Sequence, residues 1–317
     1  MARESILITG VSGFVGKHLV GALSGRDIHG TCLCHEAGLE IPGVKMIPCD
    51  LEDQASVESA VRLASPSVVY HLAAQSSVKA SLDDPSGTHR INVLGTAYLL
   101  EALRNQPGVR VVIQVSSAEV YGIVSESETP LSEESPLKPG NPYSWSKALA
   151  EMLSAGYCRD FGLPIVTLRP FNHIGPGQSD KFVSSNFARQ IAEIEAGIRL
   201  PQIMVGNLEA RRDFTDVRDI VRAYDAAAQK CVPGEIYNIA SGRAVAISEI
   251  LSGLLSLTPA KVEVVTDPAR MRPSDLPVLL GDSSKFRTAT GWSPNIPLAE
   301  TLQSLLDYWR RSVGMSS

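Results

Sequence analysis

The chain contains 317 residues, of which 44% are hydrophobic and 20% are charged, and its formal net charge is −5. This length suits one large domain with a smaller lobe, and the slightly acidic charge excludes electrostatic attraction to nucleic acid or to an anionic membrane. No apolar run approaches the length of a membrane span, and the N-terminus carries no secretory leader pattern. We therefore expect a cytoplasmic protein whose partner is a small molecule.

The five cysteines, at positions 32, 34, 49, 158 and 231, form an odd set without metal-ligand spacing. Cys32 and Cys34 alternate as residues on one face of a strand do, which is a simpler explanation than a metal site. We expect reduced thiols and no metal.

The first predicted strand leads directly into a glycine turn. An apolar run, Ile6–Thr9, is followed by Gly10, Gly13 and Gly16 and then by a helical pattern over 17–24. Glycines at this spacing let the turn close, let backbone N–H groups approach a pyrophosphate, and let the helix pack tightly on the strand. Because the triplet follows a strand and opens a helix, it predicts a dinucleotide site.

Strand and helix patterns alternate through the first 170 residues. Further short apolar runs occur at about 28–34, 44–47, 67–70, 111–115 and 165–168, and helical patterns include 89–103 and 143–160. This alternation predicts an α/β fold with a doubly wound parallel (Rossmann) sheet, in which the ligand lies over the carboxyl ends of the strands.

Two of these strands are followed by residues that suit a dinucleotide. Asp50 and Leu51 follow the third strand and are placed to meet the adenine, whereas Ala73 and Ala74 follow the fourth and leave room for the cofactor backbone. The two alanines are equally compatible with simple helix–sheet packing. An acidic or basic residue after the second strand normally selects NAD or NADP, and residues 34–36 do not decide between them.

One predicted helix carries a tyrosine and a lysine one turn apart. Asn141 suits its N-cap and Gly162 its end, so Tyr143 and Lys147 share a face. A phenol has an ordinary pKa of about 10 and needs a nearby cation to act as an acid–base group at neutral pH. Ser117, after the strand at 111–115, is placed to hydrogen-bond the oxygen that Tyr143 protonates. On its own, the pattern also fits an ordinary surface Tyr and Lys.

Beyond residue 170 the pattern changes to loops, helices and isolated strands, of which 235–239 is expected to return to the main sheet. Arg211 or Arg212, together with Arg272, suits a diphosphate, because planar guanidinium groups bind phosphate through two hydrogen bonds. Surface arginines are the alternative. The expected division is a dinucleotide-binding domain at 1–170, rejoined at about 215–240, and a smaller mixed substrate domain at 171–317.

These motifs together resemble the extended short-chain dehydrogenase/reductase family over essentially the whole chain. The resemblance is carried, in this order, by Gly10-x-x-Gly13-x-x-Gly16, Asp50-Leu51, His71-Leu-Ala-Ala74, Asn92, Ser117 and Tyr143-x-x-x-Lys147. The segments 171–178, 207–214 and 271–275 resemble the branch of that family that acts on GDP-sugars. The ordered set is far more specific than any single motif.

The resemblance implies an enzyme that uses NAD(P)H to reduce the C4 ketone of GDP-4-keto-6-deoxy-D-mannose to a GDP-6-deoxyhexose of the GDP-D-rhamnose type. NADP is the expected cofactor and NAD the alternative. Tyr143 is then the general acid, Lys147 lowers its pKa and binds the nicotinamide ribose, and Ser117 orients the C4 oxygen. Residues 171–317 become a nucleotide-sugar domain, and the protein a homodimer built on the Tyr143 helix and its neighbour.

The remaining implied site residues fall into two groups. The cofactor group consists of Gly10, Gly13, Phe14, Val15, Gly16, Asp50, Leu51, Leu72, Ala73, Ala74, Asn92, Tyr143 and Lys147. The substrate group consists of Asn172, Arg212 and Arg272 for the diphosphate and Asp275 for the nucleoside.

Glu119 leaves other activities open. A 4,6-dehydratase needs a carboxylate to remove the C5 proton, and dehydratases of the family carry theirs at this position. Reductases of the GDP-sugar branch also resemble the chain here, and Ala118 and the segment 173–177 favour reduction. Dehydration is the second hypothesis and 4-epimerisation the third. A dinucleotide-binding sensor without turnover is the non-enzymatic hypothesis, which the retention of Tyr143 and Lys147 disfavours.

Overall fold

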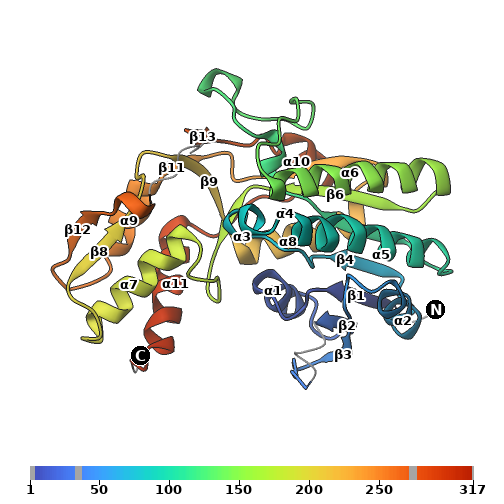
Figure 1. Ribbon diagram of the computed structural model, residues 1–317, viewed down its shortest axis with the longest axis horizontal. Helices are drawn as coiled ribbons and strands as arrows, with labels where there is room; N and C mark the ends of the chain where they lie inside the picture. Colours follow the sequence, from blue (N-terminus) through green and yellow to red (C-terminus); the bar gives the residue numbers. More distant parts are fainter. Residues whose placement is uncertain (1–3, 33–37, 271–276, 316–317) are drawn as a thin grey trace.

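A parallel sheet forms the centre of the larger lobe (Figure 1). In the described part of the chain it has seven strands in the order β10-β6-β5-β4-β1-β2-β3. The computed structural model describes residues 4–32, 38–270 and 277–315. The strands are β1 (Ser5–Thr9), β2 (Asp27–Cys32), β3 (Val44–Pro48), β4 (Val68–His71), β5 (Val111–Val115), β6 (Ile165–Pro170) and β10 (Ile236–Ile239). Strands are added outward from β1 to β2 and β3 on one side, and from β4 to β5, β6 and β10 on the other, so the strand order reverses between β1 and β4. The predicted doubly wound fold is confirmed.

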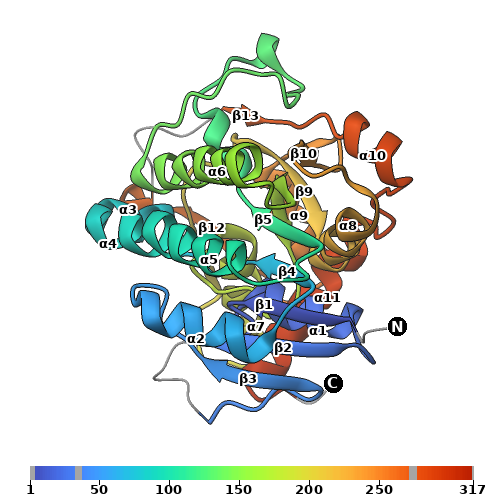
Figure 2. The ribbon, with the colours of Figure 1, turned by 90° about the vertical axis from the view of Figure 1, so that its right-hand side faces the viewer.

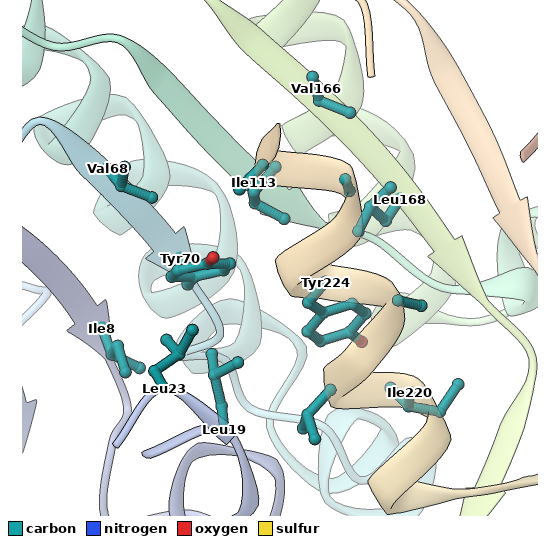
Figure 3. Packing of buried hydrophobic residues seen from close by; sticks show 14 of the residues in the cluster. Ile8, Leu19, Leu23, Val68, Tyr70, Ile113, Val166, Leu168, Ile220 and Tyr224 are labelled. Carbon is teal, nitrogen blue, oxygen red and sulfur yellow. The ribbon is translucent and has the colours of Figure 1, made fainter. Parts of the chain in front are cut away.

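Helices cover both faces of this sheet (Figure 2). One face carries α1 (Phe14–Ala22), α8 (Val217–Lys230) and α10 (Ser284–Thr290), and the other carries α2 (Gln54–Ala64), α5 (Gly95–Arg104) and α6 (Pro142–Phe161). Figure 3 shows the core on the first face, where the fully buried rings of Tyr70 and Tyr224 pack among aliphatic side chains. Both faces of the sheet are therefore buried, as parallel sheets require.

The caps of α6 are the predicted ones. The side chain of Asn141 accepts a hydrogen bond from the backbone N–H of Ser144, Pro142 occupies the first helical position, and Gly162 ends the helix with φ +70°. Tyr143 therefore lies in the first turn of α6.

The helix expected at 89–103 is interrupted. Two short helices, α3 (Val78–Asp83) and α4 (Pro85–His89), lead into a π-helical turn, η2 (Arg90–Leu94), before α5 begins. π-helical turns occur often at functional sites. Here the turn contains Asn92, whose buried side chain bonds to neighbouring segments.

The smaller lobe has its own core. Its helices are α7 (Val183–Glu195), α9 (Ile247–Leu255) and α11 (Leu298–Ser312). One small sheet pairs β8 (Gln202–Val205) with β12 (Glu263–Thr266). Another contains β11 (Ala244–Ala246), β9 (Arg211–Asp216) and β13 (Val278–Leu279), with β7 (Asn172–Ile174) paired to β9. Side chains such as Phe187, Ile250 and Leu305 fill its interior.

Short 3₁₀ turns elsewhere in the chain lie at η3 (Ala118–Tyr121), η4 (Glu126–Glu128) and η5 (Pro268–Arg270). None of the described helices is both long and apolar enough to span a bilayer.

Candidate active site

The turn between β1 and α1 requires glycine for two different reasons. Gly10 has φ +69°, and a Cβ added there would lie 2.9 Å from Cα of Ala73. A Cβ on Gly16 would lie 2.6 Å from the backbone oxygen of Val11. The helix α1 begins at Phe14 with Gly13 as its N-cap, so its first N–H groups are directed out of the helix N-terminus. This cradle fits a pyrophosphate.

Phe14 joins this turn to the segment that enters the smaller lobe. Its ring stacks on His173, with 6.1 Å between ring centroids and 10° between planes, and contacts His18 edge-on. Nε2 of His18 lies 2.8 Å from the backbone oxygen of Pro176. Val15 packs against the core beneath the sheet. We infer that Phe14 and Val15 contribute to cofactor binding through their backbone.

His71, at the end of β4, is part of a directional chain of hydrogen bonds. Thr96 donates its hydroxyl proton to the backbone oxygen of Asn92 (2.7 Å), so it accepts from Nε2–H of His71 at 3.0 Å. Nδ1 then accepts from the hydroxyl of Thr9 at 2.8 Å, and Thr9 accepts from the N–H of Ala73 at 3.1 Å. Burial, followed by the charge of Lys147, lowers the pKa of His71 to about 3. His71 is therefore neutral and holds the backbone that follows β4.

The other residues expected at the cofactor lie around this edge of the sheet. The carboxylate of Asp50 accepts from the N–H of Glu52 at 2.9 Å, and Asp50 is exposed. Leu51 is buried, and a Cβ on Gly95 would lie 2.9 Å from its Cβ. Leu72 packs against the core on the face covered by α1, α8 and α10, and Ala73 packs against Gly10. Ala73 thus packs against the glycine turn itself, so its packing role does not conflict with the predicted contact to the cofactor.

Asn92 links two segments of the site. Its Oδ1 accepts from the N–H of Gln75 at 2.8 Å, and its Nδ2 donates to the backbone oxygen of Gln75 and to the hydroxyl of Ser146. Ser146 in turn donates to the backbone oxygen of Tyr143 at 2.7 Å. We infer that Asn92 supports the cofactor site by holding the segment after Ala74 against α6.

Tyr143, Ser117 and Glu119 converge from two elements. The Ser117 hydroxyl lies close enough to the Tyr143 phenol to stabilise its ionised form, and Ser117 Oγ accepts from the N–H of Glu119 at 3.2 Å. Burial raises the pKa of Tyr143 to about 12; the neighbouring Ser117 hydroxyl opposes this rise and the charge of Glu119 adds to it. The phenol therefore holds its proton at neutral pH, as a general acid must.

Lys147 is buried one turn beyond Tyr143, and its Nζ donates to the backbone oxygen of Val115 at 2.8 Å. Burial lowers its pKa to about 8, while the charge of Glu151 raises it. In the described structure, the pKa of Tyr143 is set by burial, Ser117 and Glu119. The predicted action of Lys147 on the phenol therefore stays a prediction.

The expected substrate residues are only partly described. Asn172 lies on β7 opposite Phe214 of β9, two residues along from Arg212. Oδ1 of Asn172 is buried and has no hydrogen-bond partner among the described residues. Arg212 donates to the backbone oxygen of Arg211 at 2.9 Å. Arg272 and Asp275 lie outside the described residues, as do residues 34–36, which were considered for cofactor selection.

Sequence reasoning missed Glu151 and Arg169, which form a buried ion pair behind the site. The signal at Glu151 was its spacing, four residues beyond Lys147 on the same helix face. Arg169 carried no comparable signal, because its partner is distant in sequence.

A glycine turn over the reversal point of a doubly wound sheet, with a buried tyrosine and lysine on the adjoining helix, defines an NAD(P)-dependent oxidoreductase of the extended short-chain dehydrogenase/reductase type. Residues 7–305 match the family model described as GDP-mannose 4,6 dehydratase, and the chain belongs to this family.

Individual relatives are consistent with this assignment. The chain is 36% identical over 310 residues to GDP-6-deoxy-D-mannose reductase of Pseudomonas aeruginosa, covering 98% of both chains. It is 30% identical to GDP-mannose 4,6 dehydratase 2 of Arabidopsis thaliana, covering 96% of this chain and 86% of that one. The solved structure of RMD from P. aeruginosa complexed with NADPH matches with a TM-score of 0.86 and 34% identity, over 97% of this chain and 99% of that one.

Proposed function

We propose that the protein reduces the C4 ketone of GDP-4-keto-6-deoxy-D-mannose to a GDP-6-deoxyhexose of the GDP-D-rhamnose type, using NADPH. The observation that carries the proposal is the buried, protonated Tyr143 with the Ser117 hydroxyl beside it, in a chain 36% identical to a GDP-6-deoxy-D-mannose reductase over nearly its whole length. NADPH is preferred because it is present in the related RMD structure. NAD is the alternative.

The chemistry balances with these residues. The bound nicotinamide cofactor supplies a hydride to C4. Tyr143 gives its proton to the C4 oxygen, so that ketone, hydride and proton become an alcohol. Ser117 orients this oxygen toward the phenol. Lys147 keeps a positive charge behind Tyr143 and thereby stabilises the phenolate left after proton transfer.

The smaller lobe is assigned to the nucleotide sugar in the same proposal. Asn172 offers a buried acceptor oxygen without a described partner, and Arg212 lies on the adjacent strand. Buried polar atoms without protein partners are uncommon, so a ligand group is a suitable partner for Asn172. Residues 1–170, with the return at about 215–240, would bind the dinucleotide. Arg272 and Asp275 keep their predicted roles at the diphosphate and nucleoside.

Homodimerisation through α6 belongs to the same proposal. Trp145, Leu149 and Met152 are 45%, 43% and 70% exposed on one side of α6, and Leu94 of η2 is 47% exposed. Leu149 and Leu94 line one shallow hollow. Apolar side chains clustered in this way typically mark an interface. We also propose a cytoplasmic location, as a small-molecule enzyme of this kind requires only soluble partners.

The direct test measures NADPH oxidation with GDP-4-keto-6-deoxymannose and, separately, with GDP-mannose. Oxidation with the keto sugar alone is expected. Dehydration is the second candidate, because the coupling of Glu119 to Tyr143 places near the acid the carboxylate that removal of the C5 proton requires. Formation of keto sugar from GDP-mannose without net cofactor consumption would replace the reductase assignment by a dehydratase. Absence of turnover with both substrates, despite measurable NADPH binding, would favour the sensor hypothesis.

A further inference from the structure

Glu151 extends the Tyr143 and Lys147 face of α6 by another turn. The three side chains recur at intervals of four residues, and their residues are 8%, 6% and 5% exposed, in chain order. Burying a carboxylate costs free energy unless the charge is paired and hydrogen bonded. The partners of Glu151 therefore indicate what the carboxylate supports.

Arg169 of β6 supplies the compensating charge. Its Nε lies 3.0 Å from Oε1 of Glu151 and its Nη2 lies 2.7 Å from Oε2, so the pair is bidentate. The exposed side-chain fractions are 3% for Arg169 and 5% for Glu151. Ser116 also donates its hydroxyl to Oε1. The carboxylate thus fixes the residue immediately before Ser117.

The other end of Arg169 reaches the turn that carries Glu119. Nη1 donates to the hydroxyl of Tyr121 at 3.0 Å and to the backbone oxygen of Glu133 at 3.3 Å. Tyr121 donates to Oδ1 of Asn238 at 2.7 Å. Since Tyr121 lies two residues after Glu119 in η3, the ion pair restrains both η3 and the segment Ser116–Ser117 that leads into it from β5.

The pair also acts electrostatically on Lys147. The ammonium is buried and bonded to the carbonyl oxygen of Val115, next to Ser116. In this environment the negative charge of Glu151 opposes the loss of the ammonium proton that burial promotes. Arg169 pairs with the same carboxylate and carries a positive charge, which by Coulomb's law offsets part of the field that Glu151 exerts on Lys147.

We propose that Glu151 and Arg169 are positioning residues, which set the geometry of Ser116–Ser117 and the charge of Lys147 without touching substrate or cofactor. This inference rests on the proposed function for its kinetic readout. Among the described groups, Glu151 on α6 and His71 on β4 are coupled directly to Lys147, and Arg169 on β6 pairs with Glu151. Glu119 on η3 and Tyr224 on α8 are coupled to Tyr143, one turn away on α6. From α3 and η2, the uncharged Ser81 and Asn92 bond to α6.

The test uses substitutions with opposite electrostatic signs. Glu151→Gln removes the negative charge and leaves Arg169 unbalanced, so Lys147 should lose its proton at a lower pH. Arg169→Met removes the positive charge, so the proton should be lost at a higher pH. If Arg169→Met does not fold, the double variant Glu151→Gln/Arg169→Met restores a neutral pair. The pH at which half of Lys147 has lost its proton should then lie between the values for Glu151→Gln and the wild type.

Two readouts separate this inference from the proposed function. Acetic anhydride labelling of Lys147 as a function of pH, quantified by mass spectrometry on the cofactor-free protein, gives the midpoint without any turnover. In steady-state reduction, Glu151→Gln should lower kcat by roughly 10- to 100-fold with little change in KM, and should move the alkaline limb to lower pH. An inactive wild type would overturn the proposed function, whereas the labelling midpoints would still test the inference.

Glu195→Gln is the matched control, because Glu195 forms a similar bidentate pair with Arg310 in the smaller lobe, at 2.7 and 2.8 Å. It should reduce stability without changing kcat or the labelling midpoint. Coincident midpoints in Glu151→Gln and the wild type, or an equal loss of kcat at every pH, would overturn the inference.

Discussion

The side chains of Ser117 and Tyr143 lie beside each other, although Ser117 follows strand β5 and Tyr143 lies in the first turn of α6. This contact places a hydroxyl beside a phenol that burial keeps protonated, and the distance between them in sequence is closed only by folding. It is the pair on which the proposed reaction depends.

Tyr143→Phe should abolish proton donation while preserving the buried ring. We expect kcat for NADPH oxidation to fall by roughly 10²- to 10⁴-fold, the range for loss of a positioned general acid. NADPH binding, measured by fluorescence titration, should change little. Ser117→Ala should cause a smaller loss, because the phenol remains. Wild-type turnover in Tyr143→Phe would refute the assigned acid.

Gly10→Ala should damage both stability and cofactor binding. The positive φ and the 2.9 Å approach to Ala73 leave no space for a Cβ, and such backbone strain costs about 1–3 kcal/mol. Urea unfolding and NADPH titration measure the two effects. Gly21→Ala is the control, since an added Cβ on that exposed residue of α1 meets nothing within 4 Å. It should raise helix stability by roughly 0.5–1 kcal/mol.

The buried, neutral His71 should cause the free energy of unfolding to decrease as the pH falls. Its folded pKa is lowered to about 3, whereas an unfolded histidine titrates near 6.5. Between these values the unfolded chain binds a proton that the folded chain excludes, so the free energy of unfolding decreases from about pH 6.5 downward.

His71→Asn should remove this contribution. The variant should be less stable than the wild type at pH 7, because hydrogen bonds to Thr9 or Thr96 are lost. The difference in urea-unfolding free energy between the two should narrow at pH 5. A constant difference from pH 7 to pH 5 would contradict a neutral buried His71.

Met152→Glu should weaken the proposed dimer. The side chain is 70% exposed on the apolar side of α6, and a charge there would be buried in a helix–helix interface. Light scattering after size-exclusion chromatography should show a shift from about two chains toward one. Leu200→Glu, at a 75% exposed position in the smaller lobe, should leave the mass unchanged. Equal masses for Met152→Glu and the wild type would place the interface elsewhere or exclude it.

The sequence alone determined the features that depend on neighbouring residues. The caps at Asn141 and Gly162 define the bounds of α6, and the glycine turn follows the first strand, because helix ends and tight turns are governed by local backbone requirements. The spacing of Tyr143 and Lys147 places them on one face for the same reason. The alternation of apolar runs similarly determined the doubly wound sheet.

Only the tertiary structure decided which partners those residues have. The π-helical turn around Asn92, the neutral state of His71 and the pairing of Glu151 with Arg169 each depend on atoms from distant segments. Burial is what gives these contacts their effect, since the same charges exposed to water would shift pKa values far less. Sequence spacing can place a side chain on a face, whereas the enclosure that sets its charge comes from the packed fold.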